Sequence, residues 1–169
     1  MAVVATAEAG LSAISKGATI VQLRAPHATA RELEREAAAL VPKASVPVVV
    51  SSRCDVALAA GAAGVNLPEK DISVAEAKRL MGHRLVGRSV HSVASALEAA
   101  REGADYVIFG PVWESPSHPG ERPQGVRALA EVARAVRIPV LAIGGVNEER
   151  VNVCADAGAA GYAAITMFK

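Results

Sequence analysis

Eight short aliphatic runs recur along the chain, and stretches with helical periodicity separate most of them. The runs cover residues 2–6, 19–24, 46–52, 63–68, 84–89, 105–112, 138–146 and 161–168. Strands that alternate with helices predict a parallel sheet, because parallel neighbours need a crossover connection. Since the runs carry apolar residues on both faces, we expect both faces of the sheet to be covered.

The number of repeats favours a compact (β/α)₈ TIM barrel over the alternative, an open doubly wound sheet. About eight units close a ring, and polar residues fall at the end of run after run. The chain of 169 residues is short for this fold, and no sequence remains for a helix after the last run. We therefore predict one domain over residues 1–169 with the last helix missing. Either a partner copy covers the exposed edge, as in a homo-oligomer, or the chain is truncated.

Composition excludes several classes of function. Hydrophobic residues make up 51% of the chain and aromatic residues only 3%, which predicts an aliphatic core. The net charge of +1 and the scarcity of aromatic rings argue against a nucleic-acid-binding surface. The N-terminus has no signal-peptide pattern, and no apolar stretch is long enough to span a bilayer. Cys54 and Cys154 lack metal-ligand spacing and fit buried thiols. We expect a cytoplasmic protein without membrane or nucleic-acid partners.

The last two runs end in residues typical of a phosphate site. Gly144 and Gly145 end the seventh run, and Ile165 and Thr166 end the eighth. In many barrels the loops after these strands bind phosphate through backbone N–H groups, which glycine allows the anion to approach. We expect Gly125 to add a further donor. The alternative is that the two glycines only form a tight turn.

Other runs end in side chains suited to binding or proton transfer. Gln22 and Arg24 share one strand face, as do Ser89 and His91, because strand side chains alternate. An arginine at a barrel mouth favours an anion, although an ion pair with an acidic neighbour remains open. We expect His91 either to take part in proton transfer, for which histidine is the most suitable side chain, or to cap or pack against the next helix. Ser51 and Asn66 end two further runs.

The segment 113–124 is long for a connection and rich in polar residues, so it predicts a lid over the site. Its hydroxyl and ionisable groups suit a phosphorylated ligand. The candidates are Glu114, Ser115, Ser117, His118 and Arg122. The alternative is a solvated loop without a role.

Six motifs together resemble the thiamine phosphate synthase superfamily, in order and in spacing: "QLR", "DVALAAGAAGVNL", "GRSVHS", "GADYVIFGPV", "IPVLAIGGV" and "GAAGYAAIT". The resemblance covers nearly the whole chain and implies a (β/α)₈ barrel. It also implies one of two activities. A synthase joins a hydroxymethylpyrimidine pyrophosphate to a thiazole phosphate using Mg²⁺. A TenI-type thiazole tautomerase isomerises a thiazole carboxylate phosphate without metal.

Departures from the synthase pattern favour the tautomerase. Pro26 stands where the synthases have lysine, Asn66 where they have histidine, and His118 where they have a loop lysine. Ser52 replaces an aspartate that ligates Mg²⁺ in the family, which leaves Asp71 as the remaining metal ligand. One carboxylate makes a poor Mg²⁺ site. We therefore expect no cofactor, with Mg²⁺ only if the chain is a synthase.

The favoured hypothesis is thus a metal-independent thiazole tautomerase. Tautomerases carry their proton-transferring histidine at the position of Pro111, so His91, His118 and Glu114 are the substitute catalytic candidates. The alternatives are a Mg²⁺-dependent thiamine phosphate synthase and a non-catalytic protein that binds thiazole or thiamine phosphate. In each case we expect a thiazole phosphate to contact Gln22, Arg24, Ser51, Asn66, Ser89, Ser115, Ser117, Gly125, Gly144, Gly145, Ile165 and Thr166.

Overall fold

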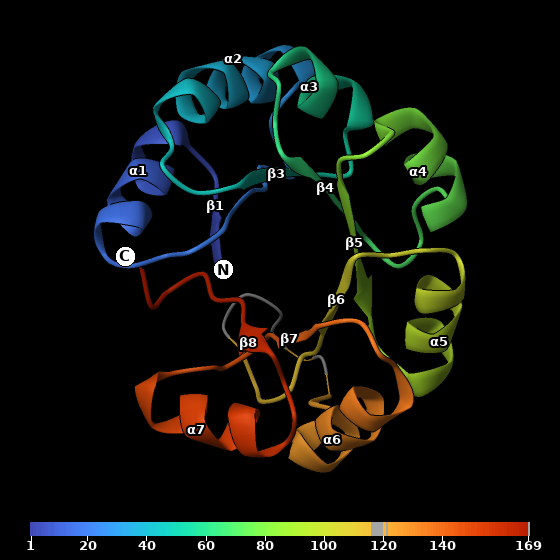
Figure 1. Ribbon diagram of the computed structural model, residues 1–169. Helices are drawn as coiled ribbons and strands as arrows, with labels where there is room; N and C mark the ends of the chain where they lie inside the picture. The colour runs from blue at the N-terminus through green and yellow to red at the C-terminus, as the bar shows by residue number, and fades with distance from the viewer. Residues whose placement is uncertain (116–119, 121, 169) are drawn as a thin grey trace.

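The computed structural model describes residues 1–115, 120 and 122–168. It contains an eight-stranded sheet in which every neighbouring pair is parallel and the strands follow one another in chain order. Figure 1 shows the sheet curled around a central axis. The strands are β1 (Ala2–Val4), β2 (Val21–Leu23), β3 (Val48–Ser51), β4 (Gly64–Leu67), β5 (Leu85–Val90), β6 (Tyr106–Phe109), β7 (Val140–Ala142) and β8 (Gly161–Tyr162).

The helices lie on the outside of the curled sheet (Figure 1). They are α1 (Ala7–Ser15), α2 (Ala30–Leu40), α3 (Cys54–Ala59), α4 (Val74–Met81), α5 (Val93–Arg101), α6 (Gly125–Ala135) and α7 (Glu148–Asp156), with a 3₁₀ turn η1 (Val41–Lys43) after α2. Each predicted aliphatic run overlaps one observed strand, so the predicted strand–helix alternation is confirmed. Strand β5 ends one residue beyond its run, and the other strands are shorter than their runs because the ends of those runs form loops.

Side-chain caps fix where several helices begin. Thr29 and Ser73 each accept a hydrogen bond from the backbone of the third helical residue, whose glutamate side chain accepts one in return. Ser92 caps α5 in the same way with Ser95. Each such cap satisfies backbone donors that have no partner inside the helix. The cap at Ser92 also places His91 at the junction between β5 and α5.

The core has two layers because strand side chains alternate between the faces of the sheet. On β6, Val107 and Phe109 belong to a large cluster that includes helix residues. Tyr106 and Ile108 belong to a second cluster that contains no residue of any helix and therefore lies inside the curved sheet. The predicted aliphatic core is confirmed. The inner layer forms the floor on which a site at the strand ends can rest.

The two ends of the sheet approach each other. Ala2 and Ala164 form a parallel bridge, with hydrogen bonds from Val3 N to Ala164 O (2.9 Å) and from Ala164 N to Met1 O (3.0 Å). Residues 163–168 form no helix. Instead, Phe168 stacks on Tyr162 with ring centroids 6.4 Å apart and packs against a small cluster that includes Ala13 of α1. None of the helices that the structure describes is long and apolar enough to cross a membrane. The homo-oligomer stays a prediction.

Candidate active site

A cavity of about 330 Å³ opens at the carboxyl ends of the strands. Its walls come from the last residues of the strands and the loops that follow them, which is where the active sites of (β/α)₈ barrels lie. Most of the residues predicted from sequence line it. These are Gln22, Arg24, Ser51, Asn66, Ser89, His91, Ser115, Gly144, Gly145, Ile165 and Thr166. The structure therefore brings together residues that are up to 144 positions apart in the chain.

Four predicted site residues are placed elsewhere or are not described. Glu114 is exposed and does not line the cavity. Gly125 begins α6, and its N–H donates to the Val112 carbonyl at 3.0 Å, so this N–H is not presented to the cavity. Ser117 and His118 lie outside the described residues. The predicted lid therefore stays a prediction.

Two buried amides form the polar part of the cavity floor. Gln22 on β2 is 4% exposed and Asn66 on β4 is 1% exposed. Asn66 Nδ2 donates to Ser89 Oγ at 3.0 Å, whereas Asn66 Oδ1 has no hydrogen-bond partner in the described part of the chain. A buried acceptor without a partner is costly, so this oxygen is a candidate acceptor for a ligand donor or a bound water.

Arg24 lies directly after β2 at the mouth of the cavity, where its side chain is exposed. The salt bridges among the described residues do not include it. The alternative of a structural ion pair therefore has no support in the described chain. The positive charge of Arg24 is available to an anion.

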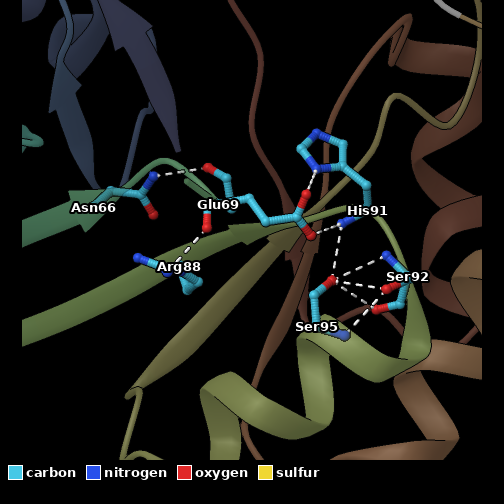
Figure 2. A network of polar contacts seen from close by, with 7 residues as sticks. Asn66, Glu69, Arg88, His91, Ser92 and Ser95 are labelled. Carbon is cyan, nitrogen blue, oxygen red and sulfur yellow. Dashed lines mark hydrogen bonds and ion pairs between the residues drawn. The ribbon is translucent and has the colours of Figure 1, made fainter. Parts of the chain in front are cut away.

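His91 and Glu69 form a pair on the cavity wall (Figure 2). His91 Nδ1 lies 2.8 Å from Glu69 Oε2, and the His91 backbone N–H donates to Glu69 Oε1 at 3.2 Å. Arg88 fixes the backbone below this pair by donating to the Glu69 carbonyl at 3.0 Å. Burial acts to raise the pKa of the Glu69 carboxyl, but hydrogen bonds from Ser95 and His91 outweigh it, and the pKa lies below its usual value.

Sequence reasoning missed Glu69. The signal was an acidic residue inside the motif "NLPEKD", three positions after Asn66, where the chain leaves β4. A carboxylate on Nδ1 orients the imidazole and leaves Nε2 as its second functional nitrogen. The pair can therefore hold a charged or hydrogen-bonding ligand group at a defined position on the wall.

The loop after β7 presents backbone donors. The carbonyl of Ile143 accepts from Val112 N at 2.8 Å, and the carbonyl of Gly144 accepts from Trp113 N at 3.1 Å. In a trans peptide the N–H points away from the preceding carbonyl, so the N–H groups of Gly144 and Gly145 face away from the 112–113 segment. Neither has a partner among the described residues, and both glycines line the cavity. Their φ angles of 92° and 65° favour glycine.

Asp71, the predicted remaining metal ligand, lies outside the main cavity. The Ser52 hydroxyl donates to Asp71 Oδ2, and the Ile72 N–H donates to Asp71 Oδ1 at 2.8 Å. Ser52 has a φ of 66°, in the left-handed region. Asp71 adjoins a second, smaller hollow that Arg88 and Glu98 also line.

Comparison with known proteins shows the family of this chain. A family model described as thiamine monophosphate synthase matches residues 3–168. The chain belongs to the thiamine monophosphate synthase family. The "Putative thiamine-phosphate synthase 2" of Aquifex aeolicus is 40% identical over 158 residues, which are 92% of this chain and 85% of that protein. The "Thiamine-phosphate synthase" of Chloroflexus aurantiacus is 41% identical over 159 residues, 92% of this chain and 74% of that protein.

A solved structure shows the same architecture. The "Thiamine phosphate pyrophosphorylase" from Pyrococcus furiosus superposes with a TM-score of 0.85 at 34% identity, over 95% of this chain and 79% of that one. The superfamily resemblance read from the motifs is therefore confirmed. Its narrower form, a TenI-type tautomerase, has no support among these relatives.

The favoured prediction of a thiazole tautomerase is wrong. The curated relatives at about 40% identity over most of the chain are named as synthases. That prediction gave great weight to a few single-residue departures. One of them, Pro26, is exposed and does not line the cavity, so its effect on the site was overestimated. The catalytic roles predicted for His91, His118 and Glu114 were argued for a tautomerase, and they stay predictions.

Proposed function

We propose that this chain is a thiamine-phosphate synthase that joins a pyrimidine pyrophosphate to a thiazole phosphate. The observation that carries the proposal is the identity of about 40% to proteins named thiamine-phosphate synthase, which extends over 92% of this chain. The cavity supports it, because it combines backbone donors, buried amides and Arg24, which forms no ion pair with a described residue.

The reaction needs little acid–base chemistry from the protein. The thiazole nitrogen lone pair forms a bond to the pyrimidine methylene carbon, the C–O bond to pyrophosphate breaks, and the departing oxygen keeps the electron pair. The tasks of the protein are to align the two rings and to stabilise the negative charge on the leaving group.

Each group on the cavity wall suits one of these tasks. The N–H groups of Gly144 and Gly145 provide a site for the thiazole phosphate, because a nest of backbone donors binds an anion. Arg24 provides a positive charge for the second anionic group at the mouth. Gln22 and Asn66 provide the donors and acceptors that orient a heterocycle on the floor.

The side chains that could hold Mg²⁺ fit that ion poorly. Asp71 is the single carboxylate at the position the family resemblance assigns, and both of its oxygens already accept hydrogen bonds, from Ser52 and Ile72. Mg²⁺ prefers oxygen ligands in an octahedral arrangement and is commonly bound through one or two carboxylates plus substrate phosphates. We therefore propose that the protein alone binds Mg²⁺ weakly and that pyrophosphate must supply most of its ligands.

We also infer that the curled sheet functions as a closed (β/α)₈ barrel. The support is the bridge between Ala2 and Ala164, which joins the first strand to the segment after the last. Closure would hold the loops after β7 and β8 beside those after β1 and β2, as a single mouth requires.

The decisive experiment is to incubate the purified protein with hydroxymethylpyrimidine pyrophosphate and thiazole phosphate, with and without Mg²⁺. We expect equal amounts of thiamine phosphate and pyrophosphate to form. Arg127→Met, on the exposed face of α6, serves as the matched control and should keep the wild-type rate. Binding of both substrates without any product would refute the proposal and leave a binding protein in its place.

A further inference from the structure

We propose that Arg150 is a positioning residue that holds the backbone donors of the β7–α7 loop toward the phosphate of the substrate. This inference rests on the proposed function, because it assigns the phosphate of a thiazole phosphate to that loop. Arg150 lies in the first turn of α7 and does not line the cavity. It would act through Gly145 and Trp113 and not through contact with the ligand.

Two contacts tie Arg150 to the loops on either side. Its Nη1 donates to the Gly145 carbonyl at 2.6 Å. Its guanidinium carbon lies 4.9 Å from the centroid of the Trp113 ring, in the β6–α6 connection. A guanidinium so placed over an indole is held by a cation–π attraction. Arg150 therefore joins the loop after β7 to the loop after β6.

The hydrogen bond to Gly145 sets the direction of the next N–H group. Because the peptide is trans, fixing the Gly145 carbonyl toward Arg150 turns the Val146 N–H the opposite way. Val146 lines the cavity, and its N–H has no partner in the described chain. The carbonyl groups of Ile143 and Gly144 also accept hydrogen bonds, which orients the N–H groups of Gly144 and Gly145 in the same way. The peptide between Gly145 and Val146 is therefore the third in a row whose carbonyl is held. The loop thus presents three successive donors, and Arg150 orients the last one.

The packing around Gly145 leaves little room for another arrangement. A Cβ added at Gly145 would lie 2.5 Å from the Glu114 carbonyl oxygen, 2.8 Å from Trp113 Cβ and 3.2 Å from Arg150 Nη1. The backbone of Arg150 is itself fixed by the helix cap, since its N–H donates to the Asn147 side chain at 3.1 Å. Arg150 is therefore held at the start of α7, and the Gly145 peptide that it contacts has little room to move.

The charge of Arg150 adds to its geometric role. Arg150 forms no salt bridge with a described residue, so none of the described carboxylates neutralises it. Its positive charge polarises the Gly145 peptide in the sense that makes the Val146 N–H a better donor to an anion. Lysine can replace the charge but cannot combine a fixed hydrogen bond with flat stacking on the indole.

The test compares ligands that differ only in the phosphate. The affinities for thiazole phosphate and for the unphosphorylated thiazole alcohol are measured by calorimetry for the wild type, Arg150→Met, Arg150→Lys and the control Arg127→Met. We expect Arg150→Met to weaken thiazole phosphate about tenfold, which is about 1.4 kcal/mol, with the alcohol unchanged. The affinity of Arg150→Lys for thiazole phosphate should lie between those of the wild type and Arg150→Met. The affinity of Arg127→Met should match that of the wild type. In turnover, Arg150→Met should raise KM for thiazole phosphate more than it lowers kcat.

A set of results would overturn the inference. Equal losses for thiazole phosphate and the alcohol in both Arg150 variants would show that Arg150 only supports the fold. The inference would also be refuted if Arg150→Met bound thiazole phosphate as tightly as the wild type does. It would be refuted as well if the wild type bound thiazole phosphate and the alcohol with equal affinity. Trp113→Leu should reproduce the phosphate-specific loss if Arg150→Met does not fold. A last outcome is that the wild type lacks synthase turnover while Arg150→Met still loses affinity for thiazole phosphate but not for the alcohol. That pair of results would refute the proposed function and support the role of Arg150.

Discussion

At the scale of single residues, the polar side chains of the cavity differ in how far the protein satisfies them. Glu69 and His91 satisfy each other, whereas Asn66 keeps an acceptor without a partner and Arg24 keeps a charge without a counter-ion in the described chain. Unsatisfied groups cost stability in the free protein and are repaid only when a ligand binds. The polar groups that the cavity keeps available for a ligand therefore lower the stability of the ligand-free protein.

Asn66→Leu should separate the two effects. The substitution keeps the branched shape and removes a buried acceptor without a described partner, but it also removes the hydrogen bond from Nδ2 to Ser89 Oγ. The two effects oppose each other, so we expect the free energy of unfolding to change by less than about 1 kcal/mol. Affinity for at least one of the two substrates should fall at the same time, because the floor loses a polar group. Chemical denaturation and calorimetry provide the two measurements. A variant that is less stable but binds both substrates normally would show that the acceptor serves the fold.

Glu69→Gln should weaken the folded state in a pH-dependent way. The pKa of Glu69 is lower in the folded protein than its ordinary value of 4.5, so its carboxylate stabilises the fold above that pH. The contribution is lost as pH falls through the lowered folded pKa. The side chain is 31% exposed, so we expect less than about 1 kcal/mol at neutral pH.

The measurement is the unfolding free energy of wild type and Glu69→Gln from pH 7 downward. The difference between them should be present at pH 7 and disappear in acid. Glu34→Gln, on the exposed side of α2, is the matched control and should show no such trend. A difference that grows as pH falls would contradict the assigned direction of the pKa shift.

At the scale of elements, two strand glycines allow neighbouring strands to pack closely. A Cβ at Gly64 on β4 would lie 2.1 Å from the Leu85 carbonyl oxygen, which is backbone. A Cβ at Gly87 on β5 would lie 2.1 Å from Tyr106 Cζ, at the far end of a side chain. The two positions look alike in sequence, but one is limited by a strand and the other by a ring.

Gly64→Ala and Gly87→Ala should both destabilise the protein, by about 1–3 kcal/mol or more, because overpacking forces neighbours apart. Tyr106→Leu should offset part of the cost of Gly87→Ala, since it removes the ring that the new methyl group meets. It should not offset the cost of Gly64→Ala. Double-mutant cycles of unfolding free energy measure this coupling. Equal coupling of Tyr106 to both glycines would contradict the packing described.

The proposed weak binding of Mg²⁺ rests on Ser52 and Asp71, which lie in the connections after β3 and β4. Calorimetric titration of Mg²⁺ should give no tight binding to the protein alone, and stronger binding once pyrophosphate is present, because one carboxylate supplies too few ligands. Ser52→Asp should increase affinity for Mg²⁺ about tenfold by adding a second carboxylate beside Asp71. Aspartate tolerates the positive φ at this position better than most residues. Tight binding of Mg²⁺ by the wild type alone would contradict this prediction.

At the scale of the whole molecule, one ligand would bridge loops that follow most of the strands. Such a ligand binds the folded state alone and therefore stabilises the entire fold by mass action. At a free concentration of about 100 times Kd the gain is about 2.7 kcal/mol. For a domain of this size that corresponds to a rise in Tm of about 5–10 °C.

Thiazole phosphate should produce this rise in the wild type and not in Gly145→Val. The added side chain meets Glu114 and Trp113 and cannot readily adopt the φ of 65°, so it disturbs the donors of the loop. Each protein is compared with itself, with and without ligand, so any loss of stability in the variant does not affect the test. Equal shifts in both would place the phosphate elsewhere.

What the sequence determined by itself was the repeating architecture and most of the cavity wall. The eight apolar runs each overlap a strand, and residues near their ends, such as Gln22, Ser89 and Gly144, line the cavity. This was predictable because strand periodicity and chain order are local properties, and parallel strands bring all their carboxyl ends to one side.

Only the tertiary structure decided which groups the protein satisfies internally. It pairs Glu69 with His91, gives the Gly125 N–H to Val112, and leaves the Asn66 acceptor without a partner in the described chain. It also places Arg150, five residues beyond Gly145, between that glycine and Trp113. Hydrogen bonds and ring contacts depend on distances of a few ångströms between segments far apart in the chain. Residue spacing alone does not specify such distances.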